Sequence, residues 1–167
     1  ALAYCVTRHS TSYLRCPGEF SEDVVSPVFG ADFRFSPGVW PRLCDGEDMS
    51  IVSCGHATIH AIQAARHLAS QGVQSSVVHA GSIRPFDRDA IVQMARRTRR
   101  MVACEYHSPA GGLGSLVAET LTETGLPVRL LRIGLTGQSD RETSGVEEIV
   151  RAAKTLLKPE GRRSRHT

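Results

Sequence analysis

The sequence predicts a three-layer α/β domain, in which a mainly parallel sheet of about five strands is flanked by helices. First, short apolar runs alternate with longer segments of helical periodicity four times between residues 48 and 157. Second, the apolar runs are nearly continuous, as in strands that are buried on both faces. Third, 167 residues are enough for one ordinary domain and not comfortably for two.

Start and stop signals support the individual helices. Gly72 and Gly125 each follow apolar residues at helical spacing, and they predict helix C-termini because glycine adopts a left-handed backbone easily. Asp87 predicts a helix N-cap, since its carboxylate can accept the free N–H groups of a first turn. Strands are expected within 49–55, 73–81, 99–106 and 126–134, and helices within 56–72, 82–98, 111–125 and 144–157.

Residues 1–47 have a different character. TSYLRC (11–16) is a strand-like piece, and 21–47 is rich in Gly and Pro without long periodicity, which predicts a linker that wraps the domain. An edge strand is expected around 33–35 or 39–43, because nearby prolines exclude a central position. The predicted organisation is an N-terminal piece (1–20), a linker (21–47), the α/β domain (48–158) and a basic tail (159–167).

Composition and charge argue against several classes of protein. The chain is 41% hydrophobic, but no segment approaches the roughly 18–20 apolar residues of a membrane span. The net charge is +3, and its basic excess in 95–100 and 160–166 predicts a solvated helix end and a frayed tail rather than a nucleic-acid face.

Five cysteines without a CxxC predict core thiols and a reducing, cytoplasmic location. The start has no signal-peptide pattern and no initiator Met, so we expect an incomplete chain or part of a longer one.

The glycine-rich stretch CEYHSPAGGLGSLVAETL (104–121) is a candidate ligand-binding loop. Its segment from Gly112 to Val117 lacks the last glycine of a dinucleotide fingerprint and lies at the third βα turn. No G-K-[ST] of a phosphate loop occurs. The glycines are therefore expected to allow a sharp turn and a close approach of the helix to the sheet.

The histidines offer a second set of candidates. His107 follows a predicted strand, where open α/β sheets bind ligands, and Glu105 lies on the same strand face, so an acid–base pair and a structural role are both open. His56 and His60 have the i,i+4 spacing of a metal pair, but no third ligand is evident and no metal site is predicted. His79 is expected to be a satisfied core or turn residue. No GxSxG or HExxH motif is present, so no catalytic residue is assigned.

The order of these segments resembles the C-terminal domain of the transketolase family of thiamine-diphosphate enzymes. That family includes deoxyxylulose-phosphate synthases and the β subunits of 2-oxoacid dehydrogenases. Residues 48–87 resemble its strand, helix and strand ending in S-I-[KR]-P-[FL]-D, and 101–121 resemble its E-x-H-S and G-G-[LF]-G-S segment. Residues 128–157 resemble its last strand and closing helix, so the resemblance covers about 33–157.

The N-terminal piece extends the resemblance. YLRCPG (13–18) resembles the last strand of the family's pyrimidine-binding domain, in which an arginine helps to bind the substrate's phosphate. Arg15 is the matching residue, and a guanidinium suits phosphate because it donates two parallel hydrogen bonds. His107 is the second substrate-binding candidate, at a position expected to face a partner domain. Between RIGL and SGVEEIV the family usually carries a longer loop, whereas here only 136–143 intervene, which puts the local surface in doubt.

The resemblance also implies what other chains supply. The family's metal-binding G-D-G motif and activating Glu are not found here, so thiamine diphosphate and Mg²⁺ would be bound by other domains or chains. The implied function is that of a C-terminal part or subunit of a multi-chain enzyme that transfers a two-carbon ketol unit, inactive alone. The implied partners carry the diphosphate-binding and pyrimidine-binding domains in a heteromer or dimer of heteromers. The alternatives are part of a 2-oxoacid dehydrogenase β subunit and a non-catalytic interaction module; E-x-H-S and R-x-P favour the transketolase branch.

Overall fold

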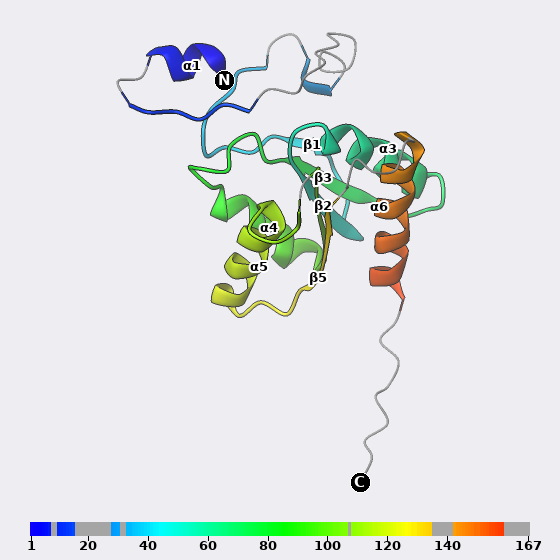
Figure 1. Ribbon diagram of the computed structural model, residues 1–167. Coiled ribbons are helices and arrows are strands. Elements are labelled where there is room, and N and C mark those ends of the chain that lie inside the picture. Colours follow the sequence, from blue (N-terminus) through cyan, green and yellow to red (C-terminus); the bar gives the residue numbers. More distant parts are fainter. Residues whose placement is uncertain (8–9, 16–27, 31–32, 107, 135–141, 159–167) are drawn as a thin grey trace.

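The computed structural model describes residues 1–7, 10–15, 28–30, 33–106, 108–134 and 142–158, with side chains from residue 145 in the last range. Figure 1 shows a sheet with helices on both faces, which confirms the predicted three-layer α/β fold. In the described part of the chain, no helix is long and apolar enough to cross a membrane.

The sheet has five strands in the order β1-β3-β2-β4-β5. β1 pairs antiparallel with β3, and the other neighbouring pairs are parallel. The four strands predicted between residues 49 and 134 are all present, with ends displaced by a few residues. The bounds of the five strands are β1 Arg42–Cys44, β2 Met49–Ser53, β3 Ser75–His79, β4 Arg100–Glu105 and β5 Arg129–Gly134.

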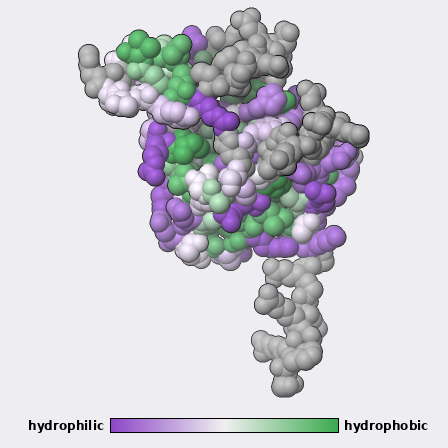
Figure 2. All heavy atoms as spheres, viewed as in Figure 1, coloured by the Kyte–Doolittle hydropathy of each residue, from purple (hydrophilic) through white to green (hydrophobic). Residues whose placement is uncertain are grey.

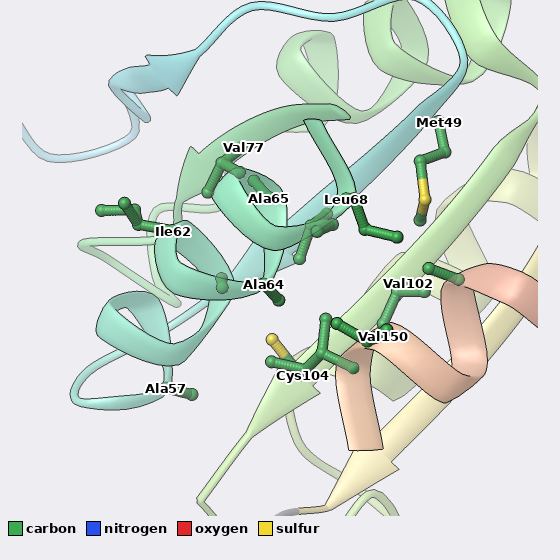
Figure 3. Close-up of a cluster of buried hydrophobic side chains, with 14 of the residues drawn as sticks. Met49, Ala57, Ile62, Ala64, Ala65, Leu68, Val77, Val102, Cys104 and Val150 are labelled. Atoms are coloured by element: carbon green, nitrogen blue, oxygen red, sulfur yellow. The ribbon is translucent and has the colours of Figure 1, made fainter. Parts of the chain in front are cut away.

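Two pairs of helices cover the two faces of the sheet. Helices α3 (Ala57–Ala69) and α6 (Glu142–Leu157) pack on one face, and α4 (Arg88–Thr98) and α5 (Leu113–Thr124) pack on the other. Successive strand residues point to opposite faces, so β2, β3, β4 and β5 each contribute to both cores. Figure 3 shows the α3 and α6 side, where Leu68, Val102, Cys104 and Val150 belong to one cluster.

The predicted cap residues lie at or near the ends of the observed helices. Asp87 is the N-cap of α4, with its Oδ1 accepting from the Ala90 N–H at 2.9 Å, and Gly125 is the left-handed C-cap of α5, so both predictions are confirmed. α3 ends at Ala69 with Ser70 as its C-cap. Gly72 still closes this helix end as predicted, because its N–H donates to the Ala69 carbonyl and the next N–H donates to the Leu68 carbonyl, each at 3.0 Å. Gly72 lies in the following turn with φ +81°.

The N-terminal region departs from prediction. Residues 11–15 are exposed and form no strand, so that prediction was wrong for the described part of the piece. A strand needs a ladder partner, which a local pattern does not supply. A short helix, α1 (Leu2–Thr7), was not anticipated, and Figure 2 shows apolar side chains over it, where Leu2 and Val6 are exposed. The expected edge strand is confirmed as β1, while 33–35 is not a strand. The domain limits stay a prediction.

The end of the linker is fastened to the S-I-R-P-F-D segment. The Gly38 N–H donates to Ser82 Oγ at 2.8 Å, and Trp40 Nε1 donates to the Ser82 carbonyl at 2.9 Å. The Trp40 N–H donates to Asp87 Oδ2 at 2.8 Å, and its buried ring meets Phe86 edge-on at 4.7 Å. We call these contacts the Trp40 latch. The S-I-R-P-F-D segment therefore has a structural role, because its residues accept hydrogen bonds from the end of the linker.

Replacing Asp87 by alanine should lower the free energy of unfolding by roughly 1–3 kcal/mol, since it removes both a helix cap and the acceptor of the Trp40 N–H. Urea unfolding of wild type and variant measures the change. Asp89→Ala is the matched control, because Asp89 is exposed in the first turn of the same helix. Equal destabilisation by the two variants would contradict this account of the latch.

Candidate functional site at the carboxyl edge of the sheet

The topology has a switch point between β2 and β4. These strands are parallel neighbours, but β2 leads to α3 on one face and β4 leads to α5 on the other. In open α/β sheets, ligands bind outside the carboxyl ends of strands at such a switch point. The residues that follow β2 and β4 at this edge are therefore the candidates for ligand contact.

Arg15 is brought to this edge from the N-terminal segment. Its side chain is exposed, and its guanidinium lies close enough to Cys54, at the end of β2, to influence that thiol. Burial raises the pKa of Cys54 to about 11 and Glu105 adds to the rise, while Arg15 opposes it. The phosphate-binding role of Arg15 stays a prediction.

The cysteines of the described part are free thiols. Cys104 is fully buried in the α3 and α6 core, and burial raises its pKa. Cys54 packs against the opposite core, and a pKa near 11 leaves it protonated at neutral pH. Both behave as the core thiols that the sequence predicted.

Glu105 holds the start of α5. The residue is 2% exposed, and its two carboxylate oxygens accept the N–H groups of Leu113 and Gly114, each at 2.9 Å. A carboxylate at this end of a helix satisfies its free donors and complements its dipole. Of the two roles left open for Glu105, the structure supports the structural one. His107 lies outside the described residues, so its substrate-binding role stays a prediction.

The glycines before α5 make this arrangement possible. Gly111 has φ +78°, which favours glycine. A Cβ on Gly112 would lie 2.0 Å from Glu105 Oε2, and one on Gly114 would lie 3.1 Å from the Arg132 side chain. The predicted sharp turn and close approach are therefore confirmed.

Three rings form a cluster beside this turn. His56 and His60 of the α3 start and Tyr106 at the end of β4 have ring centroids 5.6–5.8 Å apart. Tyr106 Oη lies 2.7 Å from His60 Nδ1, within hydrogen-bonding distance, and His60 is buried. His56 is exposed. We call these residues the His56 cluster.

Sequence reasoning found the two histidines of this cluster but missed Tyr106. The i,i+4 spacing places His56 and His60 on one helix face, but contact with a residue 46 positions after His60 is a property of the tertiary fold. Within the described ranges, no three His, Cys, Asp or Glu side chains are grouped in a way that could hold a metal ion. Within the cluster, the structure shows a hydrogen-bonding contact between Tyr106 and His60.

His79 is a satisfied core residue, as predicted. Its Nδ1 lies 2.7 Å from the Thr58 hydroxyl, which also accepts from Ser53 Oγ at 3.1 Å. The Phe29 ring meets the imidazole edge-on at 5.0 Å. Burial lowers the pKa of His79 to about 4, so the ring is neutral at physiological pH.

Acid should destabilise the fold through His79. The unfolded chain binds a proton here below about pH 6.5, while the folded chain does so only near 4, so the stability contribution is present above 6.5 and falls towards pH 4. The loss is up to about 3 kcal/mol at 1.36 kcal/mol per pKa unit. Denaturant unfolding at several pH values should show a shallower loss in His79→Gln. His67→Gln, at an exposed site on α3, should keep the wild-type slope. An unchanged slope in His79→Gln would refute the assignment.

The chain matches a known protein family over most of its α/β domain. The family model described as transketolase, C-terminal domain, matches residues 38–144. One of the subunits of the apulose-4-phosphate transketolase of Phocaeicola vulgatus is 42% identical over 102 residues, which are 61% of this chain and 33% of that protein. 1-Deoxy-D-xylulose-5-phosphate synthase 1 of Geobacter sulfurreducens is 38% identical over 99 residues, 59% of this chain and 16% of that protein.

A solved structure of a transketolase is also similar to this chain. A split-gene transketolase, described as an inactive beta4 tetramer, has a TM-score of 0.72 and 38% identity over 78% of this chain and 45% of that chain. The chain thus spans about a third or less of the length of these two curated relatives and under half of the solved chain.

Proposed function

This chain belongs to the transketolase C-terminal domain family, and from that premise we propose that it is the C-terminal part of a thiamine-diphosphate-dependent transketolase-like enzyme. The complete enzyme would transfer a two-carbon ketol unit from a ketose phosphate to an acceptor. The single observation that carries this proposal is the family match over 38–144, supported by relatives named as transketolase subunits.

The family signatures in this chain support a scaffolding role. Ser82 and Asp87 of the S-I-R-P-F-D segment accept hydrogen bonds from the linker. Glu105 of the E-x-H-S segment accepts hydrogen bonds from the start of α5. Their side chains are thereby engaged in the fold. We assign substrate contact instead to Arg15, and to His107 as a second candidate, because both belong to segments that reach or follow the carboxyl edge.

The described residues do not fit thiamine diphosphate or its Mg²⁺. A diphosphate-bound Mg²⁺ is held by carboxylate and carbonyl oxygens, yet the buried carboxylate at this edge already accepts two backbone N–H groups. We therefore propose that other domains or chains bind the cofactor, which stabilises the carbanion of the transferred unit. This domain packs against them and orients the substrate.

We propose a heteromeric assembly in the cytoplasm. Two relatives are named as one subunit of an apulose-4-phosphate transketolase, and the split-gene transketolase is inactive as a tetramer of its β chain alone. A partner chain with the diphosphate-binding and pyrimidine-binding functions fits these relatives. The free thiols of the described part suit a reducing compartment.

Reconstitution tests the proposal. The chain alone should show no ketol transfer, and activity should appear when it is co-expressed with the chains that complete the enzyme. Ketose phosphates and 2-oxoacids are supplied in parallel, because turnover of a 2-oxoacid with an acyl-carrier acceptor would indicate the dehydrogenase-like alternative. Activity of the isolated chain would refute the proposal, and a stable monomer that binds no cofactor-carrying chain would indicate an interaction module.

Replacing Arg15 by alanine should raise KM for the phosphorylated substrate roughly tenfold or more in the complete enzyme, with a smaller change in kcat. The reason is that a guanidinium pairs two phosphate oxygens, and alanine pairs none. Steady-state kinetics measure the effect. Arg96→Ala, an exposed arginine on α4, should leave both constants unchanged. An unaltered KM in Arg15→Ala would remove Arg15 from the substrate site.

A further inference from the structure

The His56 cluster presents one imidazole on a fixed base. His60 is 4% exposed, and Tyr106 holds it through the 2.7 Å hydrogen-bond contact. On the α6 side the fit is tight, because a Cβ on Gly145 would lie 2.5 Å from His60 Nδ1. The exposed ring of His56 lies against both of these held rings. His56 is thereby oriented beside the switch point between β2 and β4.

Two residues of the His56 cluster contribute less to the stability of the fold than other residue types would at the same positions. His56 is the N-cap of α3 yet makes no side-chain capping bond, although Ser, Thr, Asp or Asn would cap better. His60 buries a polar ring at a position where the remaining buried residues of α3 are apolar apart from Thr58. Departures from local rules are expected where a residue serves function. Both occur in the same cluster at the carboxyl edge of the sheet.

We propose that His56 is a specificity-determining contact for the phosphate group of the substrate, and that His60 and Tyr106 are its positioning residues. This inference rests on the proposed function. An imidazole offers an N–H donor in its neutral and its charged form, and a phosphate monoester accepts several hydrogen bonds. Arg15 reaches the same end of β2 and adds positive charge. Both oxygens of Glu105 are already engaged with N–H groups of α5.

The experiment uses the complete enzyme with a ketose phosphate and the corresponding unphosphorylated ketose. His56→Ala should raise KM for the phosphorylated substrate roughly tenfold, as expected for loss of a hydrogen bond to a charged group. The inhibition constant of inorganic phosphate should rise in parallel. KM for the unphosphorylated ketose and kcat should stay near wild type. Tyr106→Phe keeps the ring and removes only the hydroxyl, so it should produce a smaller change in the same direction.

His67→Ala is the matched control, because His67 is exposed near the other end of the same helix. It should behave as wild type with both substrates. An unchanged KM in His56→Ala, or equal changes for the two ketoses, would overturn the proposal. Loss of assembly on size-exclusion chromatography would also overturn it, because His56 would then contact the partner chain.

A second measurement separates this inference from the proposed function. If the wild-type assembly turns over no ketose phosphate, the proposed function fails. Inorganic phosphate can still be titrated into the wild-type chain while the histidine ring signals are followed by NMR. Saturable shifts that are lost in His56→Ala would support a phosphate contact. Signals that do not move would overturn it.

Discussion

Replacing Gly112 by alanine should destabilise the fold by roughly 2–4 kcal/mol, one of the two largest effects that we expect. The new Cβ would lie 2.0 Å from Glu105 Oε2 and 2.6 Å from its Cδ. The carboxylate is buried and holds two N–H groups of α5, so it cannot move away without leaving a buried charge and its donors unpaired. The free energy of unfolding from denaturant titration measures the loss.

Gly81→Ala is the control for this substitution. A Cβ at Gly81 would make only ordinary contacts of 3.4–3.5 Å with His79 and Phe35, so a change within about 0.5 kcal/mol is expected. The double variant with Glu105→Ala gives a sharper test, since Gly112→Ala should lose most of its effect once the carboxylate is gone. Additive effects in the double variant would show that the clash with Glu105 is not the cause.

Replacing Glu105 by alanine is the second large effect, also about 2–4 kcal/mol, because two buried N–H groups lose a charged acceptor and a cavity remains. Glu105→Gln should fall between alanine and wild type, since a carboxamide oxygen can accept one N–H while its amide group meets the other. Glu119→Ala, at an exposed position on α5, should change stability by less than about 0.5 kcal/mol.

The Glu105 variants also test whether this side chain has a role in activity. If Glu105 only supports the fold, Glu105→Gln should retain its catalytic constants in the complete enzyme at temperatures where it stays folded. A selective loss of kcat with unchanged unfolding energy would contradict the structural role and make Glu105 an acid–base candidate again.

Most of the α/β layer was predictable because its signals are local. Buried parallel strands and amphipathic helices leave different periods in the sequence, and Asp87 and Gly125 terminate helices through contacts within a few residues. The prediction for 11–16 was wrong over 11–15 because a strand-like piece becomes a strand only beside a partner strand. The short helix α1 carried no cap signal.

The site was less predictable, because its contacts join distant positions. The residue spacing showed that Glu105 precedes a helix, but not that its carboxylate points at Leu113 and Gly114. The His56 cluster depends on where β4 ends relative to α3, which the strand order β3-β2-β4 decides. Arg15 could be singled out by resemblance alone, since its segment has no periodicity that would place it beside Cys54.

The Trp40 latch has a consequence for how genes of this kind can be divided. A segment that begins at the first parallel strand would discard Gly38 and Trp40, leaving Ser82 and Asp87 without their backbone donors and an aromatic pocket open to water. The smallest transferable module therefore begins before Gly38, about ten residues ahead of the point at which strand periodicity starts. Fusions, splits and domain exchanges that preserve this fold have to be joined upstream of that glycine.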